Sequence, residues 1–117
     1  GVPIDLQLVR HVKEGLAAGQ IADGDELPSR RIVSATLAVN PNTVQKAYRQ
    51  LEEEGLIQSR PGAGSHITAA PAQVEEIRRE LFRREVQETV TAMKRMGLGR
   101  EEAVELLRRL YDEEEER

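Results

Sequence analysis

The sequence predicts a mostly α-helical chain with a small β-hairpin, and three observations lead to this class. Two capped amphipathic runs, residues 27–39 and 40–55, follow each other across a tight turn. Two short alternating runs then surround a Pro/Gly turn within residues 56–68. Beyond residue 70 the composition changes and helical periodicity resumes. We therefore expect an N-terminal winged helix-turn-helix DNA-binding domain over residues 1–70, followed by a two-helix C-terminal dimerisation appendage over residues 71–117.

The composition limits the classes of protein to which the chain can belong. Because it has no cysteine, disulfides and thiolate chemistry are excluded and a zinc finger is disfavoured. An aromatic content of 3% argues against proteins that stack single-stranded bases. No apolar run is long enough to span a bilayer and no signal-peptide pattern is present, so we expect a cytoplasmic protein without a membrane partner.

The distribution of charge is more informative than the net charge of -4, which by itself argues against a nucleic-acid partner. Between Leu27 and Gln50 the chain has four cations and no acid. A local basic face on an acidic protein can still bind DNA, with modest affinity and a strong dependence on salt.

The first expected helix begins at Pro3, which suits a helix start, and stops at Gly19. Its apolar stripe is formed by Leu6, Val9, Val12 and Leu16. We expect this helix to support the helix of residues 40–55 from behind rather than to bind a ligand. The run Asp23-Gly24-Asp25 then predicts a turn.

The second expected helix is capped by Ser29, and Arg30 and Arg31 lie in its first turn. Cations there oppose the helix dipole, at a cost of a few tenths of a kcal/mol each. A phosphate close to the helix start would turn this cost into a gain. The alternative is an ordinary surface pair that interacts with nearby acids such as Asp25 and Glu26.

The third expected helix has both ends marked, by Asn40 as the cap, Pro41 in the first turn and Gly55 at the stop. Its apolar stripe is formed by Val44, Ala47, Tyr48 and Leu51. The nearly opposite stripe is formed by Asn42, Gln45, Lys46 and Arg49. Amides read the edge of adenine, and arginine reads guanine or binds phosphate. The alternative for this outer stripe is an ordinary solvated surface.

The predicted hairpin turns at Pro61-Gly62-Ala63-Gly64. Gly62 and Gly64 permit the backbone to lie close to a partner, although any tight hairpin also favours glycine. Arg60 flanks the tip of this wing and is a candidate phosphate contact.

These segments resemble, in order and spacing, the DNA-binding domain of the GntR family of bacterial transcription regulators. The matching runs are Asp25-Glu26-Leu27-Pro28-Ser29-x-Arg31, Val39-Asn40-Pro41-Asn42-Thr43-Val44, Leu51-Glu52-x-Glu54-Gly55-Leu56-Ile57 and Arg60-x-Gly62-x-Gly64-Ser65. The Asn-Pro-Asn-Thr-Val run resembles the YtrA subfamily in particular. The resemblance implies that Arg31 corresponds to an arginine that contacts DNA. It also implies a short C-terminal dimerisation appendage in place of a full effector-binding domain.

Beyond a short linker at residues 69–72, the periodicity predicts a helix from Pro71 to about Met96. Its apolar residues occupy two faces, the first formed by Val74, Ile77 and Leu81 and the second by Phe82, Val86, Val90 and Met93. We expect the first part to pack on the winged helix and the second on another surface. Leu98-Gly99 breaks the helix, a further helix reaches Tyr111, and Asp112 to Glu116 are expected to form a solvated, frayed end.

Two helices of this size cannot close a hydrophobic core alone, and a second copy of the chain is the simplest partner. The expected dimer interface comprises Phe82, Val86, Val90, Met93, Val104, Leu107, Leu110 and Tyr111. A homodimer would place two equivalent helices in successive major grooves, so the operator is expected to be palindromic.

The sequence therefore predicts a homodimeric, sequence-specific regulator of transcription that binds double-stranded DNA, with repression favoured over activation. The candidate DNA-binding residues are Ser29, Arg30, Arg31, Asn40, Asn42, Thr43, Gln45, Lys46, Arg49, Arg60, Gly62 and Gly64. Among them, Gln45 and Arg49 are expected to read bases. Asn42 and Thr43 are expected to contact bases or phosphates, and Lys46, Arg31 and Arg60 to hold the backbone.

The alternative is a winged-helix module that uses the same face to bind a protein and has no sequence-specific DNA binding. An enzyme is not expected, because no nucleophile–base pair, catalytic residue or metal-ligand cluster is evident. No cofactor is expected. An unidentified small-molecule effector is left open, in a cleft beside the bundle or across the dimer, but no convergent polar set marks a site for one.

Overall fold

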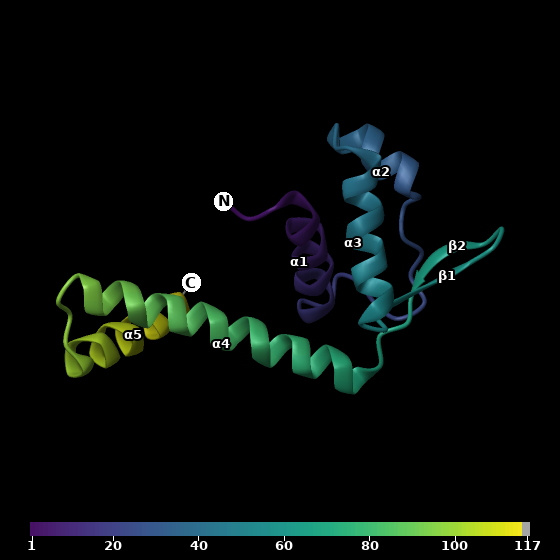
Figure 1. Ribbon diagram of the computed structural model, residues 1–117. Helices are drawn as coiled ribbons and strands as arrows, with labels where there is room; N and C mark the ends of the chain where they lie inside the picture. Colours follow the sequence, from purple (N-terminus) through teal and green to yellow (C-terminus); the bar gives the residue numbers. More distant parts are fainter. Residues whose placement is uncertain (116–117) are drawn as a thin grey trace. The chain divides into compact units, whose positions relative to one another are not determined.

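The computed structural model describes residues 1–115, and its contacts divide into two compact units, Gly1–Arg79 and a second that begins at Glu80 (Figure 1). The elements, in chain order, are α1 (Ile4–Ala17), α2 (Arg30–Leu37), α3 (Pro41–Glu53), β1 (Ile57–Arg60), β2 (Gly64–Ile67), α4 (Pro71–Arg95) and α5 (Arg100–Glu115). The mostly helical fold with one antiparallel hairpin is confirmed. The predicted boundary between residues 70 and 71 stays a prediction, since α4 belongs to both compact units.

α3 is the centre of the first unit, where it packs against α1 and α2 and contacts β1 (Figure 1). All four residues of its predicted apolar stripe, Val44, Ala47, Tyr48 and Leu51, are buried. They join Val9 and Leu16 of α1 and Ile57 and Ile67 of the hairpin in one core. Burying one large apolar side chain contributes roughly 1.5–3 kcal/mol, so this shared core fixes α3 firmly in the domain.

The predicted helix caps are present. The Ser29 hydroxyl accepts a hydrogen bond of 3.2 Å from the backbone N–H of Ile32, and the Asn40 side chain accepts one of 2.8 Å from the N–H of Asn42. Gly55 ends α3 with a φ of +75°, in the left-handed region where glycine is favoured. Both helices of the helix-turn-helix therefore begin where the sequence places them.

The turn between α2 and α3 contains an unexpected conformation. Ala38 has φ 53° and ψ 44°, which is left-handed, and is the only non-glycine residue with positive φ in the part described. The Ser34 hydroxyl donates a hydrogen bond of 2.6 Å to the Val39 carbonyl and ties this turn to α2. This local contact holds the turn although a left-handed conformation is unfavourable for alanine.

One residue of the predicted α1 stripe is not in the core. Leu6 is 41% exposed, while Val9 and Leu16 are buried and Val12 is partly buried. At 100° per residue, Leu6 lies about 90° from the centre of the buried face. Leu8, which the prediction omitted, packs against the core instead. The correction follows from the position of α3, which sequence periodicity alone does not fix.

The wing is larger than the predicted hairpin. β1 and β2 are antiparallel, with Ile57 opposite Ile67 and Arg60 opposite Gly64. Residues 24–27, expected as a turn and a helix approach, lie along the other edge of β2. There the Leu27 N–H donates to the Ser65 carbonyl at 2.9 Å, and the Ile67 N–H donates to the Asp25 carbonyl at 2.8 Å. Residues 24–27 therefore pair with the hairpin as a third backbone segment and connect it to the start of α2.

The stretch at residues 69–72 is not a loose linker. Ala69 is buried in the core of the first unit, and α4 begins at Pro71. Val74 and Ile77 pack against the same core, as predicted. Leu81, the third residue of the predicted face, is not among the residues that pack there within residues 1–115. The small side chain of Ala69 fits the interior, which composition alone does not reveal.

In the second unit, the chain reverses after α4 and α5 runs back in the opposite direction (Figure 1). The reversal uses Gly97, whose φ is +79°. α5 continues to Glu115, so the predicted fraying of residues 112–115 is wrong; glutamate favours helices and no breaker intervenes. Glu116, also predicted to fray, lies outside the described residues. Within residues 1–115 none of the helices is both long enough and apolar enough to cross a lipid bilayer.

Candidate nucleic-acid interface

The outer face of α3 presents the amides and cations that its periodicity predicts. Asn42, Lys46 and Arg49 are exposed, and Thr43 and Gln45 are half-buried. Within the described part of the chain, the side chains of Asn42, Gln45, Lys46 and Arg49 have no hydrogen bond or ion pair. Their polar groups are therefore available to a ligand.

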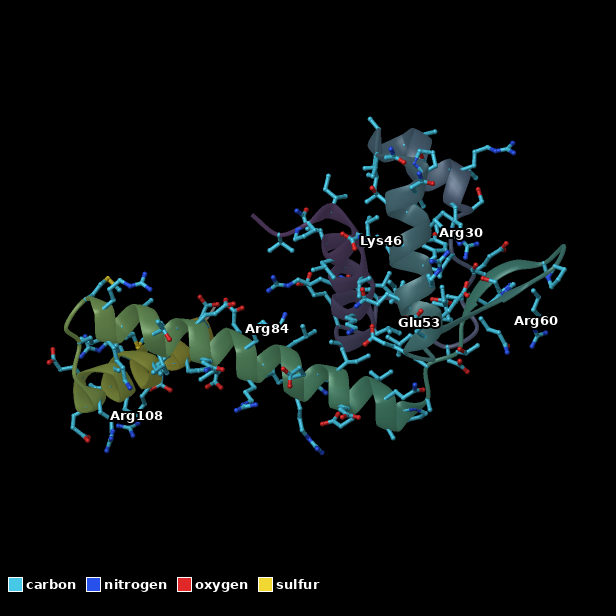
Figure 2. All side chains as sticks on the ribbon, viewed as in Figure 1. Arg30, Lys46, Glu53, Arg60, Arg84 and Arg108 are labelled. Atoms are coloured by element: carbon cyan, nitrogen blue, oxygen red, sulfur yellow. The ribbon has the colours of Figure 1, made fainter. Side chains whose placement is uncertain are left out.

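Two further exposed cations come from α2 and the wing. Arg31 is exposed in the first turn of α2. Arg60 is exposed at the end of β1, and its side chain has one hydrogen-bond partner among residues 1–115, the Gln58 side chain at 3.4 Å. Figure 2 shows Arg60 projecting from the hairpin. Gly62 and Gly64, with φ of +77° and +73°, shape the turn beyond it.

Two predicted site residues have local structural roles. The side-chain oxygens of Ser29 and Asn40 are engaged by the backbone N–H groups of α2 and α3. Each cap fixes the start of its helix and the direction in which the following cations or amides project. Replacing such a cap by alanine typically costs about 1 kcal/mol.

Arg30 faces inward, unlike its neighbour. Its guanidinium forms an ion pair of 2.9 Å with Glu52 and lies 4.9 Å from the centroid of the Tyr48 ring. Its Nε is buried, without a hydrogen-bond partner among residues 1–115. Figure 2 shows Arg30 beside α3. The two consecutive arginines therefore differ, since Arg31 is directed to solvent and Arg30 is committed to α3.

Comparison with known proteins identifies the family. The model for the bacterial regulatory proteins of the gntR family matches residues 5–67. The chain belongs to the GntR family. A relative named "Uncharacterized HTH-type transcriptional regulator YhcF", from Bacillus subtilis, is 35% identical over 103 residues, which cover 88% of this chain and 85% of the relative.

A second GntR-family relative, the "HTH-type transcriptional repressor YtrA" of Bacillus subtilis, is 42% identical over 66 residues, or 56% of this chain and 51% of that protein. This likeness agrees with the resemblance to the YtrA subfamily. A "GntR family transcriptional regulator from Listeria monocytogenes" superposes with a TM-score of 0.81 and 27% identity, covering 93% of this chain and 96% of the other. The chain is therefore a DNA-binding transcription regulator rather than an enzyme, as predicted.

The sequence did not reveal the side-chain contacts that connect the end of α3 to α1, α2 and the wing. Glu52 of α3 accepts from Arg30 and, at 2.6 Å, from the Ser59 hydroxyl. Lys13 of α1 pairs with Glu54 at 2.8 Å. These acids are at the end of α3, beyond the cationic part of its outer face. No local signal pairs residues 22 or 41 positions apart.

The predicted dimer residues of this GntR protein lie in the second unit, and most are strongly exposed. Phe82 is 58%, Val86 60% and Tyr111 71% exposed. Val90, Val104, Leu107 and Leu110 are also exposed, and Met93 is partly buried. So much exposed apolar surface is unusual for a monomer.

A metal site and an effector site are two further kinds of site that a regulator can contain. Within residues 1–115 no group of three or more histidine, cysteine or acidic residues is placed to hold a metal ion. For an effector, a hollow of about 470 Å³ is present in the second unit, lined by Arg84, Gln87, Glu88, Thr91, Ala92 and Arg95. Because all six residues come from α4, the hollow is open and less enclosed than most ligand pockets.

Proposed function

We propose that this GntR regulator binds its operator as a homodimer, inserts α3 of each protomer into a major groove and represses transcription. The observation that carries the proposal is the outer face of α3, where Asn42, Lys46 and Arg49 are exposed and Gln45 is half-buried, and where these four side chains have no hydrogen bond or ion pair within residues 1–115. Groups left unpaired on a rigid helix are pre-organised for a ligand, because binding does not have to break existing contacts. The cytoplasm, where bacterial DNA lies, is the compartment that this role requires.

The roles of the side chains follow from their chemistry and position. Gln45 and Arg49 lie one turn apart in the middle of α3 and are proposed to read base edges. Asn42 and Thr43, in the first turn of α3, are proposed to contact bases or phosphates. The cations Lys46, Arg31 and Arg60 are proposed to bind the phosphate backbone.

The homodimer is supported by the second unit. The exposed face formed by the eight predicted interface residues needs a cover, and a second copy supplies a matching apolar face. A two-fold axis would relate two α3 helices, so the operator would have inverted half-sites with centres about 34 Å apart or a multiple of this distance. Repression is supported by the relative YtrA, which is named a repressor.

A mobility-shift titration at physiological salt with random competitor DNA tests the proposal. A site enriched from a random duplex pool should be bound at least about a thousandfold more tightly than the competitor. Binding of all sequences with equal, weak affinity would support the alternative of a winged helix that binds a protein partner.

A further inference from the structure

We propose that Glu52 of α3 is a positioning residue that holds two phosphate-binding cations, Arg31 at the start of α2 and Arg60 at the end of β1, in place beside α3. Its carboxylate Oε1 accepts from both Arg30 and Ser59. Each of these donors is the chain neighbour of one of the cations. This inference rests on the proposed function, in which Arg31 and Arg60 contact the DNA backbone.

The first contact orients the start of α2. The Arg30 Nη2 lies 2.9 Å from Glu52 Oε1, and both side chains are about one third exposed. The same guanidinium lies over the Tyr48 ring, whose hydroxyl donates to the Pro28 carbonyl. Because residues 28 and 30 are both tied to α3, the backbone that carries Arg31 has little freedom to rotate.

The second contact orients the wing. The Ser59 hydroxyl donates to the same Oε1 at 2.6 Å and lies 2.8 Å from the Ser65 hydroxyl. Ser65 is only 5% exposed and lies opposite Ser59 in the ladder of β1 and β2. One carboxylate oxygen is therefore connected to both strands of the hairpin, next to Arg60.

The direction in which DNA affinity changes when Glu52 is removed distinguishes a positioning role from a simple electrostatic effect. A carboxylate beside a DNA-binding surface repels phosphate, so its removal should strengthen binding if Glu52 acts only as a charge. If Glu52 acts through the two cations, its removal should weaken binding, because Arg31 and Arg60 then lose their fixed directions.

Glu53 supplies a matched control for this comparison. It is exposed, carries the same charge on the same helix, and its side chain has no hydrogen bond or ion pair within residues 1–115. Figure 2 labels its position near the end of α3. Alanine is the residue that best favours a helix, so both substitutions should preserve α3.

The experiment measures operator affinity and its salt dependence for Glu52→Ala and Glu53→Ala in the full chain, with the fold checked by circular dichroism. We expect Glu52→Ala to weaken binding about threefold to tenfold and to reduce the slope of affinity against salt. Glu53→Ala should bind as tightly as the wild type or slightly more tightly. Glu52→Gln, which keeps one acceptor oxygen, should restore part of the loss.

A double-mutant cycle distinguishes action through the cations from a general loss of structure. In a chain that already carries Arg31→Ala and Arg60→Ala, Glu52→Ala should have almost no further effect on affinity. Ser59→Ala, a milder change, should weaken binding in the wild type but not in the presence of Arg60→Ala. This second variant keeps the test informative if Glu52→Ala does not fold.

Three results would overturn the inference. Unchanged or tighter binding by Glu52→Ala, with both arginine variants impaired, removes the positioning role and leaves the proposed function intact. An equal loss in the background without the two cations shows that Glu52 acts elsewhere. If Arg31→Ala and Arg60→Ala bind normally, their assigned roles in the proposed function fail, and the inference fails with them.

Discussion

The guanidinium of Arg30 lies 4.9 Å from the centroid of the Tyr48 ring, so the first turn of α2 is anchored to the middle of α3. The Tyr48 hydroxyl donates to the Pro28 carbonyl and adds a second tie between the same elements. The two helices of the helix-turn-helix are therefore joined by a side-chain stack in addition to their apolar contact. This stack explains why a cation is present at a helix start, where the helix dipole disfavours it.

Replacing Tyr48 with phenylalanine should destabilise the protein by about 1 kcal/mol at neutral pH, because the Pro28 carbonyl loses its donor. Urea titrations of both proteins, at the same protein concentration, measure the difference in the free energy of unfolding. Equal free energies of unfolding would show that the hydroxyl is dispensable.

The same tyrosine predicts a pH dependence. Burial raises the pKa of Tyr48 above its ordinary value of 10.0, and the Arg30 cation lowers it in part. Because the pKa of Tyr48 is higher in the folded than in the unfolded state, the protonated hydroxyl favours the folded state. This contribution to stability is complete below pH 10 and is lost as pH rises through the folded-state pKa. The free energy of unfolding of the wild type should therefore fall more steeply above about pH 10 than that of Tyr48→Phe. If the free energies of unfolding of the two proteins fell in parallel above pH 10, the raised pKa of Tyr48 would be contradicted.

Replacing Ala38 with glycine should stabilise the fold. Ala38 has a φ of 53°, and a left-handed conformation costs an L-residue about 1–2 kcal/mol. The greater chain entropy of glycine offsets part of this gain, which leaves about 0.5–1 kcal/mol. The control is Ala35→Gly, in the exposed interior of α2, which should lose about 1 kcal/mol. Denaturant unfolding of the three proteins decides; a loss of stability in Ala38→Gly would refute the argument.

Arg49 and Lys46 should give different binding defects. Arg49→Ala should cost roughly 1–3 kcal/mol on the selected operator and relax one base position, since Arg49 is assigned to a base edge. Lys46→Ala should weaken binding to all sequences about equally and reduce the salt slope by about one phosphate equivalent. Titration of both variants against a panel of single-base operator changes makes the comparison. A uniform loss for Arg49→Ala would reassign that residue to the phosphate backbone.

Val86→Glu should dissociate the homodimer. Val86 is 60% exposed in the single chain, and a carboxylate there would be buried without a partner at the proposed interface. Gln87→Glu adds the same charge one residue away, at a polar position, and serves as the control. Sedimentation equilibrium should show a monomer for the first variant and a dimer for the second. A dimer in both would place the interface elsewhere.

The sequence predicted α3 well because three independent signals agree there. Asn40 and Gly55 mark its ends, and the buried stripe from Val44 to Leu51 has the helical period. The order of the helices and hairpin follows from the same kind of local signal. Such features depend on residues close together in the chain, and a single sequence contains them.

Features that depend on distant residues were not predictable. Arg30 and Arg31 are equivalent in sequence, but Glu52, 22 positions further along, pairs with Arg30. The backbone pairing of residues 24–27 with β2 also joins distant segments, and those residues show no strand pattern. Leu6 has the correct period for α1, but the position of α3 decides which side of that helix is covered.

The most direct test of the account is selection of binding sites from a pool of random DNA duplexes by the chain of 117 residues, followed by footprinting of the enriched site. The account predicts two copies of one short motif, inverted about a centre and spaced by one helical turn or a multiple of it, with both copies protected. Enrichment of no motif, or of one asymmetric motif protected once, would contradict it.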